Sequence, residues 1–258
     1  MIIRKSFKFR LNPTKKQTKL LCQTLDECRW LYNHLLEQRK LSYEELDLSL
    51  TKFQQMMLLP ELKRERPSLE LVHSQVLQET VMRLDKAFQN FFRRCKSGEK
   101  PGFPRFRGFE RYNSFCYNQS GFSLINKELK LSKMGNMRIK LHRPVEGKVK
   151  TGTLRREAGN WYACFSCELE ANPLPHNEKS VGIDLGIESF AALSHGQSIE
   201  NPHFFKAEEK ALAKAQRKLA TLDKGTSDRK NKRKLSQKFI LELKIVAQTF
   251  ATKSHVKL

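Results

Sequence analysis

The sequence has no long apolar run, and this absence excludes the membrane-spanning and secreted classes. No stretch among the 258 residues approaches the roughly 18 consecutive apolar residues of a transmembrane helix. The first residues, MIIRKSFKFRLNP, alternate between apolar and basic side chains and lack the continuous apolar core of a signal peptide. We therefore expect a cytoplasmic protein that has no membrane partner.

The chain lacks the paired cysteine spacing of a zinc site. The chain has six cysteines, which are reduced thiols in the cytoplasm. The one close pair, Cys164 and Cys167, lies in an alternating run that places Cys167 on the face of Trp161 and Phe165 and Cys164 on the opposite face. A zinc-binding pair usually lies on a turn and needs two further ligands, and no second pair follows. We expect no zinc in this chain.

Acidic residues are too few to balance the basic ones. Lys and Arg number 49 against 27 Asp and Glu, which gives a formal net charge of +22. Such an excess predicts attraction to polyanions, and nucleic acid is the default partner. An acidic membrane surface is the rival, but no basic amphipathic helix lies next to a hydrophobic anchor.

Alternation with a period of two marks the expected strands. In IIRKSFKFRL, Phe7, Phe9 and Leu11 lie on one face and Lys8 and Arg10 on the other, which predicts a half-buried strand with a basic outer surface. From residue 97 to about 170, short alternating runs broken by glycine, such as MRIKLHR and WYACFSCEL, predict an antiparallel sheet or a small barrel with a basic face.

Helical spacing predicts two long helices between residues 12 and 96. The first starts at NPTKKQ, with Asn12 as the N-cap and Pro13 at the first helical position. The second runs from about Leu69 to Cys95, with Ser68 as its N-cap. Their apolar stripes consist of Leu21, Leu25, Cys28, Tyr32 and Leu35 in the first helix and Val72, Val76, Leu84, Phe88, Phe91 and Phe92 in the second.

The last third of the chain begins with an expected linker over residues 170–180. A strand in VGIDLGIESFAALS follows, then a charged helix from Lys206 to about Leu222, and then a C-terminal segment of weak pattern.

Asp184, in that strand, needs an explanation because aspartate is depleted in strand interiors and an unpaired buried carboxylate is costly. Alternation places it opposite the face of Val181, Ile183 and Leu185, and the flanking glycines leave room for a metal or a phosphate. Equally, its side chain would hydrogen-bond the backbone of its own hairpin. The stretch alone leaves both interpretations open.

The loop KSGEKPGFPRFRG, residues 96–108, combines restricted backbone with aromatic and basic side chains. Phe103 and Phe106 can stack or anchor, and Arg105 and Arg107 can reach phosphates. The alternative is a loop whose aromatic side chains cap the end of the preceding helix.

The order of four segments resembles one known family. FKFRLNPTKKQ, then LDKAFQNFFRRCKSGEKPGFPRFRG, then NWYACFSCELE, then VGIDLGIESFAALSHGQSIENPHFFKAEEKALAKAQRKLA is similar to the TnpB (OrfB-type) proteins of bacterial insertion sequences, which are relatives of the type V CRISPR effectors. The resemblance covers roughly residues 1–233. It implies an α+β fold: a wedge-like β-barrel from residues 1–11 and 97–172, an inserted helical bundle of helix-turn-helix type at 12–96, and the start of an RNase H/RuvC-like domain at 180–258.

The resemblance implies a transposon-encoded, RNA-guided DNA endonuclease, often labelled a transposase, whose partners are DNA and a guide RNA. Asp184 matches the first catalytic carboxylate of the family and hence a Mg²⁺ ligand. The family's second and third carboxylates and its four-cysteine zinc ribbon would fall beyond residue 258, and the residues after Arg233 do not follow the family's basic helix. We therefore expect a truncated protein without nuclease activity, because Asp184 alone does not complete a Mg²⁺ site. The alternatives are a DNA-binding regulator that does not cut and an inactive pseudogene product.

The expected contacts to nucleic acid are basic side chains on the strands, at the helix start and in the loop. Each taken singly is a solvated charge, and only as a shared surface do they favour binding to phosphates. They are Lys5, Lys8, Arg10, Lys15, Lys16, Arg105, Arg107, Arg138, Lys140, Arg155 and Arg156.

Overall fold

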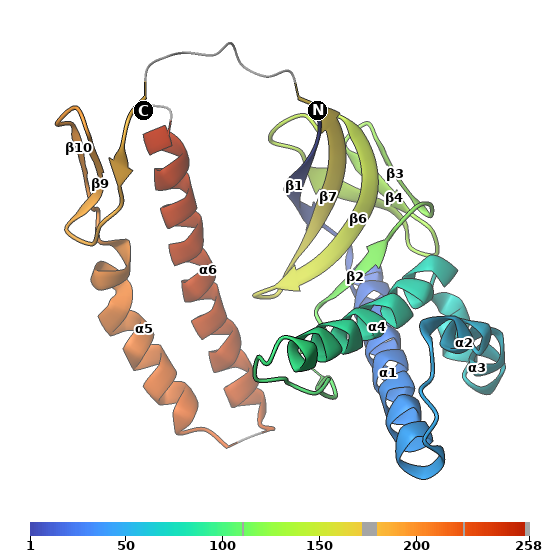
Figure 1. The fold of residues 1–258 in the computed structure, drawn as a ribbon. Helices are drawn as coiled ribbons and strands as arrows, with labels where there is room; N and C mark the ends of the chain where they lie inside the picture. Colours follow the sequence, from blue (N-terminus) through green and yellow to red (C-terminus); the bar gives the residue numbers. More distant parts are fainter. Residues whose placement is uncertain (110, 172–179, 224, 256–258) are drawn as a thin grey trace. The chain divides into compact units, whose positions relative to one another are not determined.

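A computed structural model describes residues 1–109, 111–171, 180–223 and 225–255. The chain forms two compact units, Met1–Ala171 and Asn172–Leu258 (Figure 1). The fold is mixed helix and sheet, as the sequence predicts. None of the described helices combines the length and the apolar character that crossing a membrane requires.

The first unit contains a seven-stranded antiparallel sheet whose strand order is β2-β6-β7-β1-β5-β4-β3. The strand at its centre is the N-terminal one, which pairs with β7 on one side and β5 on the other. The strands are β1 (Ile2–Asn12), β2 (Ser114–Tyr117), β3 (Phe122–Ile125), β4 (Glu128–Leu131), β5 (Gly135–Lys140), β6 (Lys148–Glu157) and β7 (Asn160–Glu170). Among the described strands, β2 and β3 are edges that do not pair with each other, so the sheet is a curled half-barrel. The sequence predicted an antiparallel sheet or a small barrel, and the structure has the antiparallel sheet, curled part of the way to a barrel.

Aromatic side chains fill the inside of the curl. Phe7 and Phe9 are almost fully buried, and Phe7 lies directly opposite Phe165 of β7 in the strand register, as alternation predicts. Phe122 of the edge strand β3 stacks on Phe165 with ring centroids 6.4 Å apart and lies 6.3 Å from the ring of Tyr117 in β2. The two edges of the sheet therefore meet through side chains across the curled interior.

The helices of the first unit share this hydrophobic core. They are α1 (Lys15–Leu46), α2 (Lys52–Met57), α3 (Leu59–Glu65), the short 3-10 helix η1 (Pro67–Leu71) and α4 (Ser74–Lys96). The apolar stripe predicted for the first helix is confirmed, since its five residues are all buried. In α4 the predicted stripe holds as far as Phe88, whereas Phe92 is 51% exposed.

Both predicted helix starts are wrong, the first because strand pairing competes with local capping and the second because a 3-10 turn comes before the helix. Thr14 is the N-cap of α1 and forms a capping box with Gln17, while Asn12 continues the strand opposite Arg138. The second long helix begins after His73, because Pro67 starts a separate 3-10 turn.

The second unit has a small sheet and two helices. Its antiparallel strands β8 (Ile183–Asp184), β9 (Ser189–Leu193) and β10 (Ser198–Glu200) are ordered β10-β9-β8. Helix α5 (Phe204–Ala220) confirms the predicted charged helix, and the segment of weak pattern forms a 29-residue helix, α6 (Ser227–His255). The two helices pack together, with the rings of Phe204 and Phe250 5.5 Å apart. Most of the expected linker lies outside the described residues.

Candidate nucleic-acid interface

A row of basic side chains crosses the outer face of the sheet. The strand register places Lys140 of β5 opposite Arg10 of β1, Arg10 opposite Tyr162 of β7, and Tyr162 opposite Arg155 of β6. Because neighbouring strands in a sheet are roughly 4.8 Å apart, these four side chains form one transverse row, which we call the strand row. Three cations and a phenol ring at this spacing present a surface suited to a phosphate backbone.

Lys8 lies two residues before Arg10 and extends the strand row on the same face. Its Nζ is 4.4 Å from the centroid of the Tyr162 ring, and it also pairs with Glu157. Glu157 also pairs with Arg155, with Nε 2.9 Å from Oε1, and Arg10 donates to the Asn160 side chain at 2.8 Å. The strand row is thus held in place by one carboxylate and one amide, and its net charge stays positive.

A second carboxylate anchors the other end of this face. Glu168 pairs with Lys150 at 2.9 Å and with Arg4 at 3.2 Å. The hydrogen bond from Lys150, with that from Arg4, lowers the pKa of Glu168 below its ordinary value. Glu168 therefore stays ionised at neutral pH, and Glu157 and Glu168 are each shared between two cations.

The start of α1 extends the basic surface at the other end of β1. Lys15 and Lys16 are exposed in the first turn, which carries no acidic residue. Arg138 lies opposite Asn12, two residues before the N-cap of the helix, and the Gln17 side chain donates to the backbone of β5 at Asn136 (2.6 Å). The positive end of the helix dipole and the free backbone N–H groups favour an anion at this position.

The loop after α4 is attached to α1 by one asparagine. The Asn33 amide donates to the backbone carbonyl of Arg107 at 3.0 Å, and the Arg107 N–H donates back to Asn33 Oδ1 at 2.7 Å. The Arg107 guanidinium lies 5.5 Å from the centroid of the Tyr32 ring, and Arg105 is exposed. Phe103 contacts Phe88 of α4 edge-on at 5.6 Å, so one loop aromatic packs on the helix, as the structural alternative expected.

Two of the expected contacts lie apart from the others, on the inner face of the sheet. Lys5 lies on the same face of β1 as Phe7. Its Nζ is 5.4 Å from the centroid of the Phe7 ring and 2.9 Å from Oε2 of Glu146, with which it forms an ion pair. Arg156 pairs in register with the buried Trp161 and donates to Cys22 Sγ of α1 at 3.6 Å. The structure therefore brings together Lys8, Arg10, Lys140 and Arg155 on one face, Lys15, Lys16 and Arg138 at the helix start, and Arg105 and Arg107 in the loop.

Asp184 lies at the edge of the small sheet, opposite Ala192 of β9. Its side chain is exposed, and Ile183 and Leu185 beside it are 50% and 70% exposed, so the carboxylate is not the costly buried charge that the pattern suggested. No hydrogen bond of the Asp184 side chain occurs within the described residues, and they contain no group of three His, Cys, Asp or Glu side chains that could hold a metal.

Sequence reasoning missed several members of the basic surface. Tyr162 belongs to the strand row, and Arg4 and Lys150 pair with Glu168 on β7. The sequence did contain a signal for Tyr162. It lies two residues before Cys164 in the same alternating run, and therefore on the same outer face of the strand. The partners of Glu168 depend on which residues of β1 and β6 lie beside β7, and that register is not visible in one strand.

Comparison with known proteins gives two family matches. A family described as "Helix-turn-helix domain" matches residues 1–47, and one described as "Probable transposase" matches residues 164–245. The first segment folds here as β1 and the single helix α1. The second includes Asp184 and continues past Arg233, where the resemblance seen in the sequence ended.

Two curated relatives have RNA-guided DNA endonuclease in their names. One, from Streptomyces pristinaespiralis, is 31% identical over 246 residues, and the other, InsQ from Escherichia coli K12, is 32% identical over 238 residues. Each alignment covers 90% of this chain and 58% of the relative, so the chain spans less than two thirds of their length. A solved chain of a Cas12f1–sgRNA–target DNA complex aligns over 98% of this chain and 71% of its own length, at 14% identity and a TM-score of 0.37, which is too low to support an argument. From the family matches and the curated relatives, we conclude that the chain belongs to the TnpB/OrfB-type family of insertion-sequence proteins.

Proposed function

We propose that the chain is a transposon-encoded, RNA-guided nucleic-acid-binding protein, and that it holds DNA and a guide RNA through phosphate contacts. The observation that carries this function is the strand row, in which three cations from three strands lie on one outer face. The formal net charge of +22 and the names of the curated relatives support it. Lys15, Lys16 and Arg138 extend the same surface to the start of α1.

In the same proposal, the curled sheet is the wedge-like domain, the helices between β1 and β2 are the recognition insertion, and residues 180–258 begin a RuvC-like domain. The transposase-type family match supports the last assignment because it includes Asp184. Asp184 is then the first carboxylate of a nuclease site.

The described residues do not fit a Mg²⁺ site of the two-metal kind. Two-metal hydrolysis needs carboxylates that converge on ions roughly 4 Å apart. Mg²⁺ also gives up its water ligands reluctantly and needs near-octahedral geometry. Asp184 is a single exposed carboxylate at a sheet edge, and the described part of the chain gathers no acidic cluster around it. A single carboxylate of this kind favours a function for these 258 residues in which the protein binds nucleic acid without cutting it, as a regulator does.

Binding is tested by a salt titration of fluorescence anisotropy. The parent chain should lose orders of magnitude in affinity between about 50 and 200 mM salt. Replacing Arg10, Lys140 and Arg155 together with Ala should weaken binding and reduce the slope of log K against log salt by about 0.9 for each duplex phosphate that the variant no longer neutralises. The matched control replaces Lys210, Lys214 and Lys218 on the exposed side of α5 and removes the same charge. A salt-independent affinity of the parent, or equal effects of the two triple variants, would contradict the proposed surface.

Cutting is tested with guide RNA, a target plasmid and Mg²⁺. The chain should not cleave, because one carboxylate cannot position the attacking water and the leaving oxygen together, and each missing interaction of that kind costs about 10²-fold or more. Asp184→Ala is the matched control. Cleavage by the parent that disappears in Asp184→Ala would show that another residue or a second chain completes the site, and the non-cutting function would then be wrong.

A further inference from the structure

A hollow lined by aromatic rings opens beside the C-terminal half of α4, outside the strand row. Its volume is about 600 Å³, within the range of small-molecule sites. The walls include Tyr43 of α1, Phe88, Phe91 and Phe92 of α4, and Phe103 of the loop that Asn33 attaches, and Arg39 also lines it. The rings are held in place by each other, since Phe103 lies edge-on to both Phe88 and Phe91 at 5.6 and 5.4 Å.

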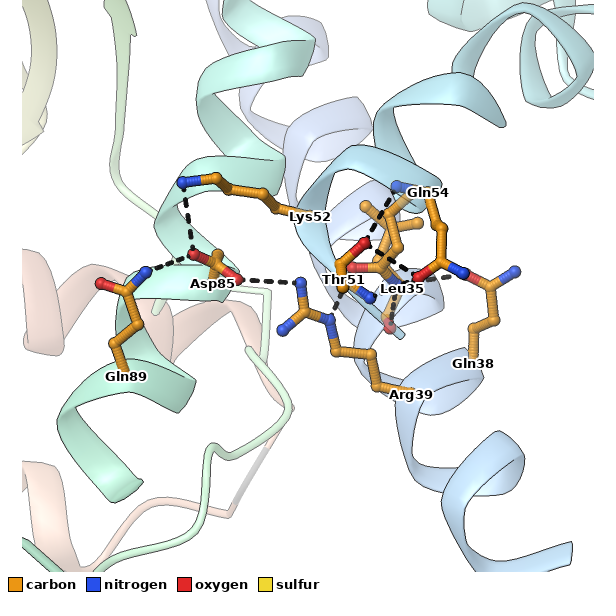
Figure 2. Close-up of polar contacts among 9 residues, drawn as sticks. Leu35, Gln38, Arg39, Thr51, Lys52, Gln54, Asp85 and Gln89 are labelled. Carbon is orange, nitrogen blue, oxygen red and sulfur yellow. Dashed lines mark hydrogen bonds and ion pairs between the residues drawn. The ribbon is translucent and has the colours of Figure 1, made fainter. Parts of the chain in front are cut away.

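Arg39 is a fixed cation in this hollow. Its side chain is only 8% exposed, and its guanidinium lies 4.9 Å from the Phe88 ring centroid. Figure 2 shows the guanidinium directed at Asp85, which Nη2 approaches to 3.3 Å, while Nε donates to Gln55 at 2.7 Å. Lys52 lies 4.0 Å from the same carboxylate, so two cations share one anion and the cluster is positive. Arg39 Nη1 makes no hydrogen bond to any described residue and is left as a donor.

A second hollow shares the Phe92 wall and has two exposed cations, Arg93 and Lys96. Phe92, Gln89, Arg93, Lys96 and Ser97 line it. Phe92 is 51% exposed and Phe103 is 48% exposed, and the cost of leaving such rings in water is recovered when a ligand covers them. At the rim of the aromatic hollow, Lys40 and Glu44 pair with each other at 3.7 Å and cancel. Aromatic walls next to cations match a base next to its phosphate.

We propose that the aromatic hollow takes an unstacked base of single-stranded nucleic acid, and that Arg93 and Lys96 hold the adjoining phosphate. The base stacks on Phe92 and Phe103, and Arg39 donates to its acceptor edge. Duplex DNA does not enter, because its bases are already stacked and paired. This inference rests on the proposed nucleic-acid function. It adds that the aromatic hollow binds single-stranded nucleic acid and not duplex DNA.

The test compares labelled single-stranded RNA, single-stranded DNA of the same sequence and the matching duplex, with the full 258-residue chain. Phe92→Ala and Phe103→Ala should each weaken single-strand binding about tenfold, the scale of one base–aromatic stack, and leave the salt slope unchanged. Arg93→Ala should instead lower the single-strand salt slope by about 0.7. Phe92→Trp should retain affinity. Phe53→Ala is the matched control, because Phe53 is 67% exposed on α2 and does not line the hollow.

A second measurement reports the stack itself. A 2-aminopurine in the single strand should lose fluorescence on binding to the parent and keep it with the Phe92→Ala, Phe103→Ala double variant. If the parent binds with the expected salt dependence but Phe92→Ala and Phe103→Ala bind like the parent, this inference is wrong while the proposed function stands. Equal losses for single strand and duplex would also overturn it. A parent that binds no nucleic acid at low salt would contradict the proposed function instead.

Discussion

Asn33 illustrates how one side chain sets the position of a basic loop. Its amide makes two hydrogen bonds to the backbone of Arg107, which imitates the exchange between paired strand residues. The loop therefore has a fixed attachment to α1, in a segment whose described residues, 97–109 and 111–113, form no regular secondary structure. Fixing the loop also fixes Phe103 in the aromatic hollow.

Asn33→Ala should release this loop. The variant loses both hydrogen bonds, so the backbone around Arg105 and Arg107 should open more often and become accessible to a protease. Limited trypsin digestion with mass spectrometry should show faster cleavage after these two arginines than in the parent. Asn113→Ala is a control within the same segment. An unchanged cleavage rate in Asn33→Ala would show that the two hydrogen bonds of Asn33 do not hold the loop.

His73 is a second residue with a testable effect, since it makes the stability of the protein depend on pH. It precedes α4, its Nδ1 is buried without a hydrogen-bond partner among the described residues, and its ring packs 5.5 Å from Tyr117. A Cβ at Gly121 would come within 2.7 Å of the ring, so the space is filled. Burial lowers the pKa of His73, and the charges of Lys133 and Lys63 lower it further.

The pH dependence follows from that direction. In the unfolded chain His73 has an ordinary pKa of about 6.5, and in the folded protein its pKa is lower. Between these two pKa values the unfolded chain binds a proton that the folded protein does not bind. The free energy of unfolding therefore decreases as the pH falls through this range. His73→Asn removes the titration and supplies a good N-cap. Melting temperatures from pH 7.5 to 5.5 should fall more steeply for the parent than for His73→Asn. Parallel curves would show that His73 titrates normally.

At the scale of elements, α1, α2 and α4 are joined by the buried polar network of Figure 2. Arg39 of α1 contacts Gln55 of α2 and Asp85 of α4, and the Gln55 amide donates to the Leu35 carbonyl at 2.9 Å. Burial lowers the pKa of Arg39, and the hydrogen bond to Asp85 opposes that effect. The short helix α2 is therefore attached to α1 through the hydrogen bonds of its buried Gln55.

Asp85→Ala should destabilise the first unit by about 3–5 kcal/mol, because it leaves a buried guanidinium without its anion. The control, Glu44→Ala, removes the exposed pair with Lys40 and should change the free energy of unfolding by about 0.5 kcal/mol or less. Urea denaturation measures both. A small effect of Asp85→Ala would mean that Arg39 reaches water when its partner is removed.

Helices and strands could be predicted where their pattern lies within one segment of the sequence. The strand row could not be predicted, because it depends on pairing between distant segments. Alternation placed Phe7 and Phe9 inward and Lys8 and Arg10 outward without reference to the rest of the chain. The choice of Thr14 over Asn12 as N-cap required knowing that Asn12 pairs with Arg138, about 126 residues later in the chain. The strand row depends on three such registers, and the pairing of Lys8 with Glu157 depends on two of them. The exposure of Asp184 depends on which strands lie beside β8.

At the scale of the molecule, burial is distributed unevenly between the two units. Every residue of the large hydrophobic cluster lies within Met1–Ala171. In the second unit the buried side chains among the described residues are Ala191, Leu193, Leu212 and Ser236. The first unit has the core of an independent domain, and the second has little apolar burial to oppose the entropy of unfolding.

A fragment of residues 1–171 should therefore fold alone. Its thermal unfolding by calorimetry should be cooperative and should coincide with the main transition of the whole chain. A fragment of residues 172–258 should unfold without a sharp transition. A non-cooperative 1–171 fragment would show that the second unit contributes to the core of the first.

The central place of β1 in the sheet also sets an order in time. During synthesis the first strand leaves the ribosome long before β7, which ends at Glu170 and supplies one of its two neighbours. At about 5–20 residues per second, the intervening chain takes about 10–30 s to appear. Its other neighbour, β5, ends at Lys140 and also appears late. For most of that interval Phe7, Phe9 and Leu11 therefore have no sheet to enter, while α1–α4 form from nearby contacts. The nascent chain is then a helical body with an unpaired apolar strand at its tip, and this is the stage at which a chaperone has most to protect.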